Sequence, residues 1–210
     1  MNGGAALLSD PFLDWWYAPW ERAPDDAWLQ SGWPLPEPDQ LARRDGYRLW
    51  CRHAGVDPDL PPLLDPGWEM LADLTAAQLR GTARLLGGLL AARAANLPAL
   101  GALGAAQQRW CSGVASVQPL PLWQPFPAPV PDAAGVELAG LAQLAHLLET
   151  SFTGLWPRVR LVLAPPLRGA VEALLPQRAL LPPPTLAETA RVQRCWAMCR
   201  RRLALPGGAA

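Results

Sequence analysis

The sequence of 210 residues contains no lysine and no isoleucine, and it has only two histidines. The absence of lysine excludes Schiff-base chemistry and a lysine-dependent phosphate-binding loop. Every strongly basic side chain is therefore an arginine, and the basic and acidic residues balance to a formal net charge of zero. Ala, Leu, Pro and Gly are abundant, a bias typical of a GC-rich genome.

The chain also lacks a segment suited to crossing a membrane. No basic stretch followed by an apolar one opens the sequence, so we expect no secretory signal. The longest uncharged run, residues 110–131, contains six prolines after Gln118, which exclude a spanning helix. We therefore expect a cytoplasmic protein without direct membrane insertion, whose four cysteines are buried, reduced thiols.

Almost no segment alternates apolar and polar residues as a half-buried strand does, and 25 prolines interrupt the chain. These features predict a single all-α domain over 1–210, an irregular bundle of short and medium helices broken by proline-rich connections. The apolar periodicity places the clearest helices at 76–95, 98–117, 132–150 and 186–203. Residues 118–131, rich in proline, are expected to form an extended connector.

Local signals support several of these helices. Thr75 with Gln78, and Thr185 with Glu188, have the spacing of N-terminal capping boxes. The last helix carries one apolar stripe, which we expect to belong to the core. Glycines within the middle helices cost helix stability, so they indicate either close helix–helix contact or loose packing; these are Gly81, Gly87, Gly88, Gly101 and Gly104.

The zero net charge conceals a division along the chain. Residues 1–75 contain thirteen acidic residues and five arginines, whereas residues 76–210 contain thirteen arginines and five acidic residues. The acidic part carries five of the eleven tryptophans in its first 33 residues, and tryptophan is common at interface hot spots. Such a chain either clamps its own halves together or bridges two partners. The candidate interaction residues are Asp25, Asp26, Asp57, Asp59, Asp65, Trp20, Trp28, Arg191, Arg194, Arg200, Arg201 and Arg202.

The sequence offers little that is typical of catalysis, metal binding or nucleic-acid recognition. Neither His53 nor His146 lies in a recognisable catalytic pattern. Cys51 and His53 have only one residue between them, which fits finger-type zinc ligation poorly. Cys195 and Cys199 lie one helical turn apart, a spacing that zinc can use, but Cys199 falls on the apolar stripe of the last helix. We therefore expect no catalytic residue, metal, cofactor or disulfide. The neutral net charge and the absence of a known motif also indicate no nucleic-acid partner.

Residues 155–163, LWPRVRLVL, resemble the tryptophan–basic–leucine stretch of the SctK family (YscK/PscK type), accessory proteins of the bacterial type III secretion sorting platform. The prolines at 182–184, the closing Leu-, Cys- and Arg-bearing helix, the length and the Leu-rich middle are similar too. An aromatic–proline run at 17–20 is weakly similar, but the histidine expected there is absent.

The resemblance implies a cytosolic, largely helical, non-enzymatic adaptor for protein transport in virulence. It would connect the sorting-platform pod protein (SctQ type) to the cytoplasmic FHA-like domain of the inner-membrane ring protein (SctD type), and so lie peripheral to the inner membrane. We expect a monomer when the protein is isolated. Two alternatives stay open: a small helical enzyme or cofactor-binding protein that uses His53 or His146, and a type III secretion chaperone or substrate.

Overall fold

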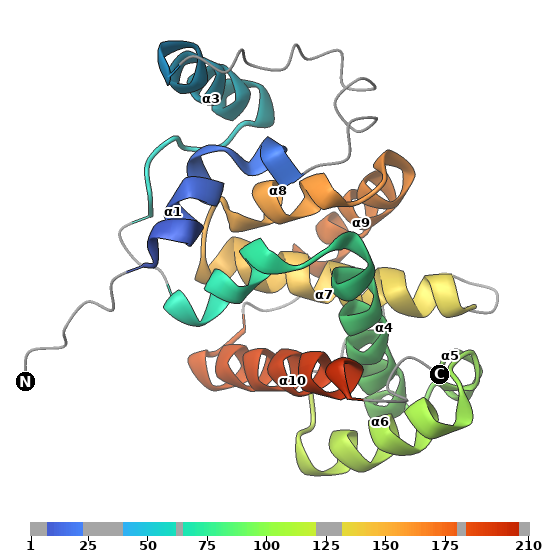
Figure 1. Ribbon diagram of the computed structural model, residues 1–210. Coiled ribbons are helices and arrows are strands. Elements are labelled where there is room, and N and C mark those ends of the chain that lie inside the picture. Colours follow the sequence, from blue (N-terminus) through green and yellow to red (C-terminus); the bar gives the residue numbers. More distant parts are fainter. Residues whose placement is uncertain (1–7, 23–39, 62–64, 121–131, 180–183, 206–210) are drawn as a thin grey trace, which may run out of the picture. The chain divides into compact units, whose positions relative to one another are not determined.

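The computed structural model describes residues 8–22, 40–61, 65–120, 132–179 and 184–205, and Figure 1 shows that its regular elements are helices. No strand occurs in these ranges, so the predicted all-α fold class is confirmed. None of the described helices is both long enough and apolar enough to cross a membrane. The chain divides into two compact units: unit 1 comprises residues 1–75 and 148–168, and unit 2 comprises 76–147 and 169–210.

Apart from α3, which has 15 residues, the described elements of unit 1 are short. They are α1 (Asp10–Tyr17), the 3₁₀ turn η1 (Pro19–Arg22), α3 (Gln40–Ala54), η2 (Pro66–Asp73), α8 (Leu155–Val159) and η3 (Arg160–Val162). A proline opens η2, where the Asp65 side chain accepts a hydrogen bond from the Gly67 N–H at 2.8 Å. Ser9 precedes α1 but makes no capping bond, because its hydroxyl instead donates to Glu69 at 2.6 Å. That bond connects the start of α1 to η2.

Apart from the short α5, the described helices of unit 2 have 13 or more residues. They are α4 (Ala76–Arg93), α5 (Leu97–Gly101), α6 (Ala105–Val117), α7 (Ala133–Ser151), α9 (Pro165–Ala179) and α10 (Leu186–Ala204). The last turn of α7 and the first turn of α9 are assigned to unit 1. Helix α4 is central to unit 2, since it contacts α5, α6 and α10.

Three of the four longest predicted helices match α4, α7 and α10 within a few residues. The capping box of α10 is confirmed, because the Glu188 N–H donates to the Thr185 hydroxyl and the Thr185 N–H donates to the Glu188 carboxylate. The prediction of one continuous helix at 98–117 is wrong, because α5 ends at Gly101 and α6 begins at Ala105. Gly104 has extended backbone at the N-cap of α6, and such a residue starts a new helix.

Helices α4 and α7 approach each other through two glycines. A Cβ atom built on Gly140 would lie 1.8 Å from the Ala83 carbonyl oxygen, and one on Gly87 would lie 1.9 Å from the Val136 carbonyl oxygen. Only glycine permits backbone contact this close. A Cβ on Gly101 would meet nothing within 4 Å. Close helix–helix contact is therefore present at Gly87 and Gly140, whereas Gly101 faces open space.

The apolar stripe of α10 belongs to the core of unit 2, as predicted. Val192, Trp196 and Cys199 are each no more than 2% exposed. Burial raises the pKa of the Cys111 thiol to about 12 and that of Cys195 to about 11, and it raises the pKa of Cys199 well above the usual value. All four cysteines are free thiols.

The start of the proline-rich connector is held by donors from α4 and α10. The Pro119 carbonyl accepts from Arg191 Nη1 at 3.0 Å, and the Leu120 carbonyl accepts from Arg93 Nε at 3.3 Å. Leu120 is buried. The rest of the connector, residues 121–131, lies outside the described residues.

Candidate functional site

A fully buried arginine lies among the aromatic residues of unit 1. Arg158 on α8 has an exposed fraction of 0%, and its guanidinium carbon lies 3.5 Å from the centroid of the Trp16 ring. Its three nitrogens donate to the Trp16 carbonyl at 3.2 Å, the Gly154 carbonyl at 2.6 Å and the Tyr47 hydroxyl at 2.6 Å. Residues from α1, α3 and the turn before α8 therefore converge on one guanidinium group.

The described hydrogen-bond and ring partners of Arg158 are uncharged. Burial lowers the pKa of Arg158, and interaction with the Tyr47 hydroxyl opposes that effect. Burial in turn raises the pKa of Tyr47, despite the nearby Arg158 charge. A planar guanidinium with several donors can bind two carbonyls, a phenol and an aromatic face at once, which a lysine ammonium cannot reproduce. Arg158 thus organises an aromatic core.

The segment of Arg158 is also the segment that carries the family resemblance. Gly154, the N-cap of α8, has a left-handed φ of +82°, a conformation that L side chains rarely adopt. Trp156 and Val159 on α8 are each 2% exposed. The LWPRV sequence therefore acts within the fold of unit 1 and presents little of its surface to a partner.

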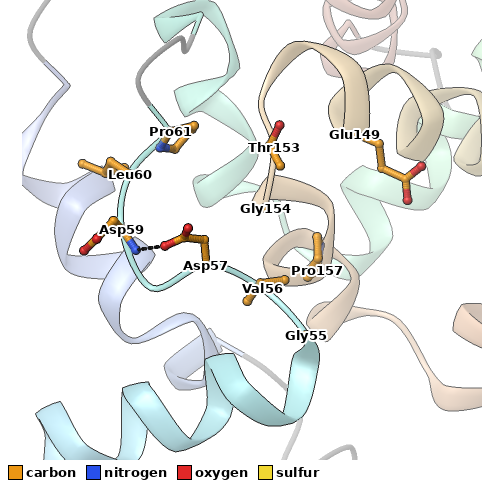
Figure 2. Close-up of a pocket in the computed structure, with 10 residues that line it drawn as sticks. All are labelled: Gly55, Val56, Asp57, Asp59, Leu60, Pro61, Glu149, Thr153, Gly154 and Pro157. Carbon is orange, nitrogen blue, oxygen red and sulfur yellow. Dashed lines mark hydrogen bonds between the residues drawn. The ribbon is translucent and has the colours of Figure 1, made fainter.

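An acidic pocket lies elsewhere in unit 1, between the loop after α3 and the turn that connects α7 to α8. Figure 2 shows Asp57 and Asp59 on the loop, with Thr153 and Gly154 across from them. The cavity has a volume of about 470 Å³. Apolar side chains complete its lining; they are Val56, Leu60, Pro61 and Pro157.

The carboxylates of this pocket come from separate parts of the sequence. The Asp57 carboxylate accepts a hydrogen bond from the Asp59 N–H at 2.9 Å, which fixes the loop, while Glu149 is contributed by the end of α7. Partial burial raises the pKa of Glu149, and the charge of Arg160 opposes the shift. Acidic groups on apolar walls suit a cationic or amphipathic side chain.

The other acidic-half candidates are distributed differently. Asp65 is not in the pocket and serves as the N-cap of η2. Trp20, at 6% exposed, packs in a cluster with Tyr47 and Trp50 and so leaves little surface for a partner. Asp25, Asp26 and Trp28 lie outside the described residues. Sequence reasoning missed Glu149 and Thr153, because only the fold brings residues 149–157 beside the loop at 55–61.

The arginine candidates of α10 differ in how much surface they present. Arg194 and Arg201 are exposed, whereas Arg200 and Arg202 are half-buried. Arg191 is half-buried too, and its bond to Pro119 already engages it within unit 2. Arg194 and Arg201 are therefore the members of this group best placed to meet a partner.

The residues considered for metal binding or catalysis do not gather into one site. Cys51 is buried, while His53 is exposed two residues later on α3. Cys195 and Cys199 face the core of unit 2, and His146 lies half-buried on α7. Within the described part of the chain, no three His, Cys, Asp or Glu side chains are grouped so that they could hold a metal ion.

Comparison with known proteins gives no match. No family model, no curated protein and no solved structure is significantly similar to this chain.

Proposed function

We propose that the chain is a non-enzymatic adaptor of a bacterial type III secretion system. In this proposal it links the SctQ-type pod protein of the cytosolic sorting platform to the cytoplasmic FHA-like domain of the SctD-type ring protein. It would act in the cytoplasm, peripheral to the inner membrane. The identity of the system rests on the resemblance of residues 155–163, and the adaptor role rests on the charge of the two units.

The division of charge between the units carries the adaptor proposal. From the sequence, unit 1 has a net charge of −6 and unit 2 a net charge of +6. Opposite fields on two compact units attract partners of opposite sign and discourage exchange of those partners. This arrangement supports a protein that binds two different surfaces.

Each unit also presents charged side chains where a partner could reach them. Asp57 and Asp59 are exposed at the pocket of unit 1, and Arg194 and Arg201 are exposed on α10 of unit 2. Exposed charges mainly raise the association rate, and salt screens them over about 10 Å at about 0.1 M. The proposal therefore predicts two salt-sensitive contacts that can be disturbed separately.

The test measures association of the full chain with the purified pod protein and with the ring-protein domain. Asp57→Arg with Asp59→Arg should slow association with one partner by roughly tenfold and spare the other. Arg194→Glu with Arg201→Glu should do the same with the partners exchanged. Asp45→Arg on α3 and Arg109→Glu on α6 are exposed single-reversal controls outside the candidate surfaces, and each carries half the charge change of a double variant.

Three outcomes would contradict the proposal. Absence of binding to both proteins would remove the secretion-system assignment. If both double variants slowed both associations equally, a general charge effect would explain the data. If neither variant changed any rate, the charge division would have no role in binding.

A further inference from the structure

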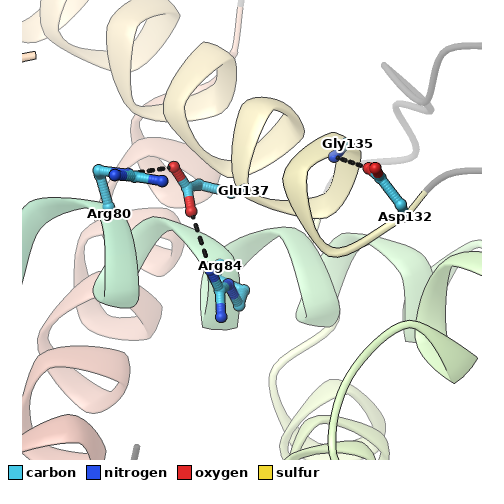
Figure 3. A network of polar contacts seen from close by, with 5 residues as sticks. All are labelled: Arg80, Arg84, Asp132, Gly135 and Glu137. Carbon is cyan, nitrogen blue, oxygen red and sulfur yellow. Dashed lines mark hydrogen bonds and ion pairs between the residues drawn. The ribbon is translucent and has the colours of Figure 1, made fainter. Parts of the chain in front are cut away.

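Unit 2 contains a small pocket at which two arginines share one buried carboxylate. Glu137 on α7 is 2% exposed, and it accepts a hydrogen bond from Arg80 Nε at 2.6 Å and another from Arg84 Nη2 at 3.1 Å. Figure 3 shows its carboxylate between the two arginines, which lie one helical turn apart on α4. The pair is therefore held on one face of the helix.

The hydrogen bonds to Glu137 use only part of the donor capacity of the two arginines. The Arg80 and Arg84 side chains are 53% and 39% exposed, whereas that of Glu137 is 3% exposed. Each guanidinium has five N–H donors, and each uses one nitrogen on Glu137. Arg84 Nε is buried and has no hydrogen-bond acceptor among the described residues. Arg80 and Arg84 therefore have further N–H groups that could donate to a ligand in the pocket.

The local charge of the group is +1, since two arginines oppose one glutamate. The remaining lining consists of Ala77, Gly81, Gln107 and Leu203, and the cavity measures about 300 Å³. Gly81 lets α10 come close, because a Cβ there would lie 2.9 Å from Leu203 Cδ2. One wall is therefore apolar, beside a pair of positioned cations.

We propose that this pocket binds a carboxylate, supplied by an Asp or Glu side chain in an acidic segment of a partner protein. A single carboxylate balances the residual charge of +1, whereas a phosphate dianion would exceed it. The Leu203 wall accommodates the apolar stem of such a side chain or an apolar neighbour. A small rotation of Arg84 toward the ligand would give its Nε an acceptor, which removes the cost of an unsatisfied buried donor.

This inference rests on the proposed function, since it names the chemistry that unit 2 recognises on its partner. It adds Arg80 and Arg84 on α4 to the basic contact for which Arg194 and Arg201 on α10 supply exposed charge. The pocket also adds geometric specificity to the general positive field of unit 2, because charge-assisted hydrogen bonds from positioned arginines require an acceptor in a defined place.

The experiment uses the ¹⁵N-labelled full chain and follows the arginine Nε–H signals by NMR. The probes are a synthetic peptide, acetyl-Leu-Asp-Glu-Leu-amide, its Asn-Gln counterpart, and inorganic phosphate. We expect saturable shifts of the Arg80 and Arg84 signals with the acidic peptide at about millimolar Kd, and at least tenfold weaker binding of the neutral peptide and of phosphate.

Variants locate the site. Arg80→Gln should weaken the acidic peptide roughly tenfold, because a charge-assisted hydrogen bond is lost. Arg109→Gln removes an equal charge from an exposed position on α6 outside the pocket, and it should change Kd less than twofold. Glu137→Gln should tighten binding, since the pocket charge rises to +2. A circular dichroism spectrum and melt for each variant separate loss of binding from loss of fold.

The results that would overturn the inference are distinct. Equal weakening by Arg80→Gln and Arg109→Gln would show binding to the general field of unit 2. Tighter binding of phosphate than of the acidic peptide would identify a free anion as the ligand. Absence of shifts with every probe would exclude the pocket, yet it would leave the adaptor proposal to its own test with the two partner proteins.

Discussion

The two units are stabilised by different chemistry. Unit 1 is made mostly of short elements from distant parts of the sequence. Its core contains closely spaced aromatic rings, such as Trp16 and Phe152 at 5.5 Å between centroids, around a buried arginine. Unit 2 is made of longer helices that approach at glycines, with Leu, Ala and Cys filling the interior. The packing of unit 1 therefore depends on the contacts of one arginine with aromatic rings, and the packing of unit 2 depends on close approach of helix backbones.

The largest expected effect tests the aromatic core of unit 1. Trp16→Ala removes a ring that contacts Phe12, Phe152 and Arg158, and it leaves a cavity beside a buried cation. We expect a loss of roughly 5 kcal/mol in the free energy of unfolding. Hydrogen exchange should show loss of protection in unit 1. Equal loss in both units would mean that the two unfold together.

The next prediction tests the backbone contact in unit 2. Gly140→Ala places a Cβ in the Ala83 carbonyl, so helices α4 and α7 must separate, at a cost of about 3 kcal/mol. Gly113→Ala on α6 is the matched control, because nothing lies within 4 Å of that position. The control should gain about 1 kcal/mol from helix propensity. Chemical denaturation measures both, and equal effects would contradict the close packing of α4 on α7.

Arg158→Lys tests whether unit 1 needs the guanidinium or only a positive charge. Lysine keeps the charge but loses the planar stacking on Trp16 and at least one of the three hydrogen bonds. We expect a loss of about 2 kcal/mol. A matched Arg48→Lys change on the exposed face of α3 should be neutral. Unchanged stability in Arg158→Lys would reduce the role of Arg158 to charge alone.

The prediction with the smallest effect near neutral pH concerns the thiols of unit 2. The pKa of Cys111 is raised to about 12 and that of Cys195 to about 11, so the folded state keeps protons that the unfolded state releases. Their stabilising contribution is complete below about pH 9 and is lost as the pH rises toward those values. Thermal melts from pH 8 to 11 should show a decline in unit 2. Cys111→Ala with Cys195→Ala should reduce that dependence, whatever its effect on stability at pH 8.

The expected resistance of these thiols to modification gives an independent readout. At pH 8 the native protein should react slowly with iodoacetamide at Cys111, Cys195 and Cys199, because the thiolate is the reactive form and the thiols are buried. Mass spectrometry of peptides identifies the modified positions. Rapid labelling at all three would contradict the burial that raises their pKa values.

The sequence by itself determined the fold class and the helices whose signals are local. Apolar periodicity and a capping box placed α10 within one residue at its C-terminal end, because these signals lie within the helix. The predicted helix at 98–117 is interrupted near Gly101 and Gly104. The sequence alone does not distinguish a glycine that ends a helix from one that a helix tolerates. Charge counts along the sequence likewise require no knowledge of contacts.

Only the tertiary structure decided which residues meet. The acidic half was visible in the sequence, but the pocket that joins Asp57 and Asp59 to Glu149 depends on residues 148–168 joining unit 1. In the sequence, Arg158 is one of two arginines in residues 155–163, and its burial follows from the arrangement of Trp16 and Tyr47 around it. The tertiary structure likewise decides the glycine contacts and the pairing of Arg80 and Arg84 with Glu137. The packing of whole helices sets such long-range contacts, and they leave no periodic pattern in the sequence.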